Sequence, residues 1–126
     1  MIYTSYFARA NKLTDVYRIS VCYSTPSWAT VEDRLPVFAP TWEILDRYKK
    51  TGNIVEYEQS YFKLLDSRKD QVKLALQQLQ ELSKDKTVLL LCWENVNKFC
   101  HRHLLAKYLG TDWKEYMEEP GIFDSI

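Results

Sequence analysis

The side chains with the greatest capacity for chemistry are gathered in one short stretch of the chain. They are Cys92, Glu94, Cys100, His101, Arg102 and His103. They offer nucleophilic or metal-binding thiols, imidazoles that exchange protons near neutral pH, a carboxylate, and a guanidinium that binds anions. Packing alone does not explain this density, so the sequence predicts that a functional site lies here.

A cysteine-dependent enzyme is one hypothesis for this stretch. Cys100 would be the nucleophile at the start of a helix, where the helix dipole and the neighbouring His101 and Arg102 favour a thiolate. Glu94 would orient or protonate a partner. Neighbouring residues on a helix diverge by about 100°, so sequence adjacency does not join the thiol to the imidazole. Whether the chain is an enzyme is therefore left open.

Zinc binding is a second hypothesis, with Cys92, Cys100, His101 and His103 as the ligands. The two cysteines are separated by residues 93–99 and the second is followed at once by histidine. This spacing matches none of the short paired-ligand spacings of structural zinc sites. We therefore expect neither a metal ion nor another cofactor.

The sequence favours a third hypothesis, a pocket for a small anionic or planar ligand such as a nucleotide. Arg102 or the helix N-terminus would bind phosphate or carboxylate, and His101 and Glu94 would supply hydrogen bonds. Further candidate ligand-binding residues follow predicted strands or carry rings that can stack on the ligand. They are Ser5, Tyr6, Ser24 and Cys92, with the rings of Tyr23, Trp28 and Trp93.

Three strands are predicted from the hydrophobic pattern. Residues 2–7 and 16–23 are rich in β-branched and aromatic residues. Residues 8–15 are too few for an ordinary crossover helix, so the relative direction of these two strands is left open. The unbroken apolar run that ends Thr87–Trp93 predicts a third strand that is covered on both faces.

Four helices are predicted from apolar residues at helical spacing. They cover about Thr41–Lys50, Ile54–Leu65, Asp70–Ser83, and Phe99 or Cys100 to Leu109. In the last helix, the apolar face formed by Leu104, Leu105 and Tyr108 also contains His101. The spacing therefore predicts that His101 points toward the sheet, whereas Arg102 and His103 project to the flank or into solvent.

This alternation of strands and helices predicts an α/β fold. We expect one domain over residues 1–126, with three layers and a small, mainly parallel sheet flanked by helices in a Rossmann-like arrangement. Residues 111–126 form a tail that packs on the domain or on a partner. Open α/β sheets bind ligands beyond the carboxyl ends of their strands. The predicted strand 87–93 therefore carries the candidate site to such an edge.

Composition narrows the classes of partner. The chain has 126 residues, 46% of them hydrophobic, and its 17 basic residues balance its 17 acidic ones. Zero net charge gives no field for strong binding to duplex nucleic acid or an anionic membrane, although aromatic rings could stack on a short single strand. The three cysteines are too few for a disulfide framework, and neither a signal segment nor a membrane span is evident.

These features predict a cytoplasmic protein that folds alone or as a homodimer. A function other than ligand binding also stays open. The aromatic-rich loop and tail could make the chain a non-enzymatic protein-interaction domain, in which the cysteine-containing stretch only completes the fold.

The stretch also resembles a known family. Leu91-Cys92-Trp93-Glu94, followed by Phe99-Cys100-His101-Arg102, is similar to the paired C-x-E and C-H-R signatures of domain-of-unknown-function family 488. Residues 2–7, 19–21 and 39–42 resemble the compact branch of that family, so the resemblance extends through Leu109. It implies an α/β domain with a site at the C-terminal edge of its sheet, and it supplies no activity. The matching site residues are Cys92, Glu94, Cys100, His101 and Arg102.

Overall fold

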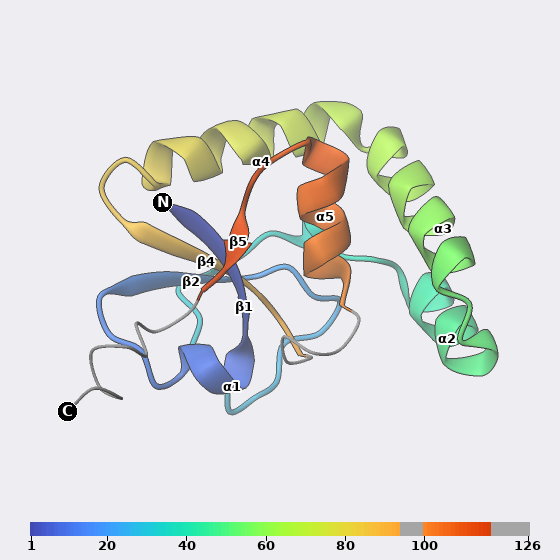
Figure 1. Cartoon of the computed structure of the whole chain (residues 1–126), viewed down its shortest axis with the longest axis horizontal. Coiled ribbons are helices and arrows are strands. Elements are labelled where there is room, and N and C mark those ends of the chain that lie inside the picture. The colour runs from blue at the N-terminus through green and yellow to red at the C-terminus, as the bar shows by residue number, and fades with distance from the viewer. Residues whose placement is uncertain (94–99, 117–126) are drawn as a thin grey trace.

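The computed structural model describes residues 1–93 and 100–116. Its centre is a sheet of five parallel strands in the order β3-β2-β4-β1-β5 (Figure 1). The strands are β1 (Ile2–Tyr6), β2 (Val16–Ser20), β3 (Asp33–Arg34), β4 (Thr87–Cys92) and β5 (Lys114–Glu115). The expected α/β class and the parallel sheet are confirmed, and the undecided pair β1 and β2 runs parallel on either side of β4.

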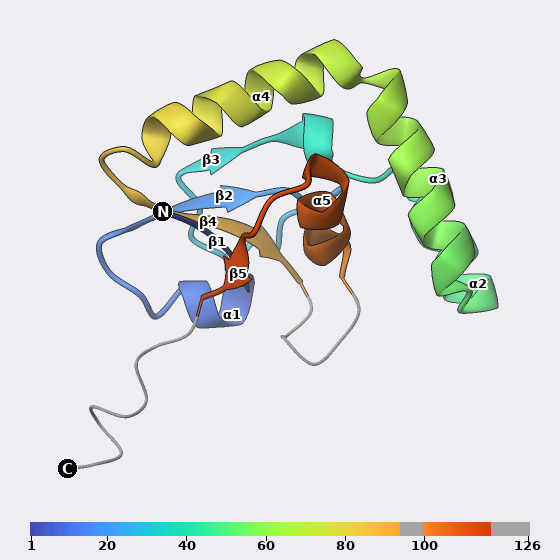
Figure 2. The ribbon, with the colours of Figure 1, turned by 45° about the horizontal axis from the view of Figure 1, so that its top comes forward.

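Helices cover both faces of the sheet unequally (Figures 1 and 2). α3 (Ile54–Ser67), α4 (Lys69–Leu82) and α5 (His101–Leu109) pack on one face, against Val88, Leu90 and Cys92. On the other face, the one-turn helix α1 (Phe7–Ala10) packs against Leu89 and Leu91. β4 is thus buried on both faces, as its apolar run predicts.

Two further helices belong to the segment between β3 and α3. The short 3-10 helix η1 (Pro36–Phe38) lies beside α4, and α2 (Trp42–Thr51) forms a hairpin with α3 that extends beyond the sheet (Figures 1 and 2). Gly52 ends α2 with a φ of 66°, a left-handed conformation that glycine adopts without steric cost. The four predicted helices are all present.

The predicted strand ends differ from the observed ones. Phe7 begins α1 rather than ending β1, and β2 ends at Ser20 rather than Tyr23. Beyond Val21, whose amide donates to the carbonyl of Leu91, the next amide lies 3.4 Å from the Ser20 hydroxyl instead of pairing with β4. The chain therefore leaves the sheet at Cys22, beside the carboxyl end of β4.

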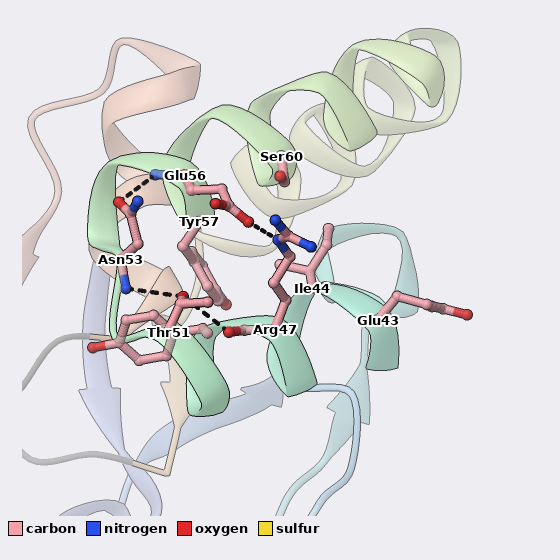
Figure 3. Close-up of a pocket in the computed structure, with 9 residues that line it drawn as sticks. Glu43, Ile44, Arg47, Thr51, Asn53, Glu56, Tyr57 and Ser60 are labelled. Carbon is pink, nitrogen blue, oxygen red and sulfur yellow. Dashed lines mark hydrogen bonds and ion pairs between the residues drawn. The ribbon is translucent and has the colours of Figure 1, made fainter.

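A small cavity of about 180 Å³ lies between α2 and α3 (Figure 3). Arg47 forms an ion pair with Glu56 across it, and the side chain of Asn53 accepts a hydrogen bond of 3.0 Å from the Glu56 amide. Asn53 is the N-cap of α3. These contacts hold the hairpin together.

Removing this cap gives a direct test of the hairpin. Asn53→Ala should lower the free energy of unfolding by about 1 kcal/mol, because one amide of the first turn loses its acceptor. Urea denaturation measures the change, and Gln59→Ala, an exposed position within α3, serves as the control. An equal effect of the two substitutions would show that the cap contributes nothing specific.

Candidate functional site

Three thiols and one imidazole meet at the carboxyl edge of the sheet. Cys92 ends β4, Cys22 follows β2, Cys100 is the N-cap of α5 and His101 is its first residue. The Cys92 Sγ lies 3.4 Å from the His101 Nδ1, and the Cys100 Sγ lies 3.9 Å from the same nitrogen. The ligand atoms of Cys22, Cys92 and His101 all lie within 4.8 Å of one another. We call these four residues the thiol–imidazole cluster.

The backbone fixes the orientation of the imidazole. The His101 Nε2 lies 2.5 Å from the carbonyl oxygen of Val21, which can only accept a hydrogen bond. Nε2 therefore donates to this carbonyl, and the Cys92 Sγ lies beside the ring, 3.4 Å from Nδ1 and 3.6 Å from Nε2. The side chain is buried, and the Tyr61 ring packs on it edge to face. The prediction that His101 points toward the sheet is confirmed.

Burial disfavours the thiolate form of two of the cysteines. Burial raises the pKa of the Cys92 and Cys100 thiols far above that of a free cysteine. His101 lowers the pKa of Cys100, but by less than burial raises it. Burial therefore opposes the thiolate that the helix start was expected to favour at Cys100.

A cavity of about 500 Å³ opens beside the cluster, between the sheet edge and the α2–α3 hairpin. This volume lies within the range of about 300–1,000 Å³ that is typical of small-molecule sites. Five aromatic residues line it: Tyr23, Trp42, Tyr48, Tyr57 and Trp93. Its polar lining among the described residues consists of Cys22, Ser24, Lys49, Cys100 and His101.

Arg102 does not line this cavity, and of its two predicted orientations the one into solvent is wrong: it lies on the flank of α5 that faces β1 and β5. Its side chain is fully buried, and its Nε and Nη2 donate to the two carboxylate oxygens of Glu115 over 2.8 and 3.2 Å. The arginine is drawn inward because β5 places this carboxylate beside β1. Arg102 and His101, adjacent on α5, thus serve different sides of the helix.

Glu115 accepts hydrogen bonds from three side chains. Burial alone would raise the pKa of its carboxyl, but hydrogen bonds from His103, Arg102 and Thr4 lower that pKa to about 2. The Thr4 hydroxyl donates over 2.8 Å, and the His103 Nε2 lies 3.1 Å away. This network ties the start of α5 to β1 and β5.

The remaining predicted residues divide between the cavity and other surroundings. Ser24 and Trp93 line the cavity, and the Trp93 indole donates to the Ser24 carbonyl over 2.9 Å. The Tyr6 ring lies 6.0 Å from the guanidinium carbon of Arg102, away from the lining residues. Ser5 is buried in the sheet, and its hydroxyl has no hydrogen-bond partner among the described residues.

Two other predicted site residues are not found among the described residues of the cavity lining. The Trp28 side chain is 53% exposed and packs edge to face against Phe7 and Trp93, on the face of the sheet that carries α1. Glu94 lies outside the residues that the structure describes. The structure thus joins Cys92, Cys100 and His101 in one site.

The family model DUF488-N3a, described as the active DUF488-N3 subclade, matches residues 2–112. The chain belongs to the DUF488 family. No curated protein and no solved structure matches it. Among the described residues, no helix of this DUF488 domain is both long enough and apolar enough to cross a membrane.

Several site residues of this DUF488 domain were not predicted from the sequence. Cys22 lies far from Cys92 in the sequence, yet it follows a neighbouring parallel strand, so the rule that carboxyl ends share an edge could have found it. Trp42 and Lys49 belong to a helix whose position against the sheet leaves no signal in the sequence. Glu115 lies in a two-residue strand without an apolar pattern.

Proposed function

We propose that this DUF488 domain binds a planar, anionic ligand of the nucleotide class in the 500 Å³ cavity at the carboxyl edge of its sheet. The observation that carries the proposal is the union of aromatic walls with one buried imidazole in a cavity of suitable size. Such a combination is typical of sites where apolar walls hold a ligand and a few polar groups orient it. In a parallel, Rossmann-like sheet this edge is also the usual binding position.

The aromatic walls supply the surface for a planar group. Trp42 and Trp93 both line the cavity with about half of their side chains exposed, at 48% and 49%. Rings held open in this way can stack on a base, and stacking on one aromatic side chain contributes about 1–3 kcal/mol per base. The Tyr23 ring lies 6.2 Å from that of Trp42 and extends the same wall.

The charges around the cavity favour an anion. Lys49 is the cation among the described lining residues, which include no carboxylate. The Lys49 Nζ lies 5.4 Å from the centre of the Trp42 ring, so a base stacked on that ring would bring its phosphate near the ammonium group. α5 begins at the cavity, and the positive end of its dipole adds to the attraction.

The roles of the other residues follow from their positions. His101 would hydrogen-bond the ligand and is the group that would exchange a proton with it if the ligand is processed. Arg102 supports the site by holding α5 against β1 and β5, and Lys49 takes the anion-binding role expected of Arg102. Nucleotide ligands and reduced thiols both suit a cytoplasmic protein.

A thermal-shift screen tests the proposal. The panel contains nucleosides, mononucleotides, inorganic phosphate and short single-stranded oligonucleotides. We expect mononucleotides to raise the melting temperature more than nucleosides or phosphate, because only they engage both the rings and Lys49. Stabilisation by oligonucleotides alone would assign the cavity to a strand end instead of a free nucleotide.

Two substitutions locate the binding. Trp42→Ala should weaken binding of the best mononucleotide about 5- to 150-fold, the equivalent of one lost stacking contact. Leu74→Ala removes an exposed apolar side chain of α4 outside the cavity lining and should leave binding unchanged. The proposal fails if no phosphate-bearing compound stabilises the domain, or if both substitutions weaken binding equally.

A further inference from the structure

We propose that the thiol–imidazole cluster is a binding site for one thiophilic divalent metal ion, with zinc as the best fit. The ligands are Cys22, Cys92, Cys100 and His101. This inference goes beyond the proposed ligand cavity but shares His101 with it: while an ion occupies the imidazole, the rings and Lys49 would hold the ligand. The spacing of Cys92, Cys100 and the histidines argued against zinc because Cys22, the ligand that the fold supplies from β2, is remote in the sequence.

Two separations between donor atoms are close to those of a tetrahedral site. Zinc bonds of about 2.3 Å to sulfur and about 2.1 Å to nitrogen place tetrahedral ligand atoms about 3.5–3.8 Å apart. The Cys92 Sγ and the His101 Nδ1 are 3.4 Å apart, and the Cys100 Sγ and the same nitrogen are 3.9 Å apart. Cys22 joins Cys92 and His101 within 4.8 Å. Cys100, which contacts the imidazole, would be the fourth ligand of a Cys3His tetrahedron once the side chains close around the ion.

The hydrogen bond to Val21 gives a second, independent indication. Metal-bound histidines almost always donate their other ring N–H to a carbonyl or carboxylate, which fixes the tautomer and the ring plane. In this structure the Nε2 of His101 contacts the Val21 carbonyl at 2.5 Å, and the Cys92 Sγ lies 3.4 Å from Nδ1 and 3.6 Å from Nε2. The carbonyl partner of a metal-bound histidine is therefore already in place, and a small turn of the ring would aim Nδ1 at an ion between the sulfurs.

Metal binding requires the thiols to lose their protons and the ion to reach the buried ligands. Binding would release the protons of the three thiols to solvent, while the imidazole keeps its Nε2 proton and no group changes oxidation state. The Cys22 thiol gives up its present contact with the Leu91 carbonyl, 3.4 Å away. Cys22, Cys100 and His101 line the cavity, which gives an ion access to an otherwise buried site.

A cobalt titration of the full chain tests this site. The protein is purified under reducing conditions, freed of metal by a chelator, and titrated with Co²⁺ and then with Zn²⁺. We expect one Co²⁺ per chain, with the visible bands of tetrahedral cobalt and the sulfur-to-cobalt charge-transfer absorption of thiolate ligands. Zn²⁺ should displace the cobalt and raise the melting temperature. Absence of stoichiometric binding, or of the charge-transfer absorption, overturns the proposal.

Matched substitutions identify the ligands. Cys22→Ala and His101→Ala should each weaken Zn²⁺ binding more than about 100-fold, because loss even of outer partners costs about 10- to 100-fold. His103→Ala removes the other histidine, which is 41% exposed and contacts Glu115, and should leave the affinity unchanged. Equal losses in the two histidine variants contradict the site. Cys22 is only half-buried, so its variant keeps the test decisive if His101→Ala fails to fold.

The two proposals can fail separately. Trp42→Ala should leave the cobalt spectrum unchanged because Trp42 is not a ligand. A normal spectrum in a domain that binds no nucleotide would refute only the proposed function.

Discussion

Arg102→Met lowers the free energy of unfolding by about 3–5 kcal/mol, the expected cost of breaking a buried ion pair from one side. The side chain is fully buried, and its Glu115 partner is only 12% exposed. Once the guanidinium is removed, the carboxylate stays in a poorly hydrated position, where its remaining hydrogen bonds do not replace the lost charge. The start of α5 also loses its anchor to β1 and β5.

Urea denaturation of four variants measures this effect. Arg47→Met breaks an exposed pair with Glu56, whose arginine is 70% exposed, and should cost less than about 1 kcal/mol. The double variant Arg102→Met with Glu115→Leu should lose less stability than the sum of its single changes, because no unpaired charge stays buried. A loss below about 1 kcal/mol for Arg102→Met would mean that the pair does not hold the helix.

Acid should destabilise the domain through Glu115. Its pKa falls from 4.5 to about 2 on folding, so the folded state favours the ionised carboxylate. The resulting stability is fully present above pH 4.5 and is lost as the pH falls from 4.5 toward 2. The shift corresponds to about 3 kcal/mol between those limits.

Comparison with Glu115→Gln isolates this contribution. The variant should be less stable than the wild type near neutral pH, and its free energy of unfolding should fall less steeply below pH 4.5, because no carboxylate is left to protonate. Glu81→Gln, at a position that is 76% exposed, provides the control. If wild type and Glu115→Gln lose stability in parallel as the pH falls, the network does not hold the carboxylate ionised.

Much of the sheet and the inward histidine could be predicted from local pattern. β4 is an unbroken apolar run, and such runs occur where both faces of a strand are covered. The face of α5 could be predicted because Leu105 packs in the core one turn after His101. Both predictions depend only on residues close together in the sequence.

The rest depends on contacts between distant segments. Lys114 and Glu115 form a strand only because β1 offers them an open edge, and their charges carry no strand signal. Arg102 is buried for the same reason, since its partner comes from that strand. Cys22 joins Cys92 through the pairing of β2 with β4, which the spacing of cysteines along the chain does not reveal.

The most direct test of the proposed ligand site is a nuclear magnetic resonance titration of the indole N–H signals with the best mononucleotide. The chain has four tryptophans: Trp28, Trp42, Trp93 and Trp113. Trp42 and Trp93 line the cavity, whereas Trp113 packs at the edge of the core. We predict saturable shifts of the Trp42 and Trp93 signals and none of Trp113. Saturation that moves Trp113 and leaves Trp42 unchanged would contradict the account.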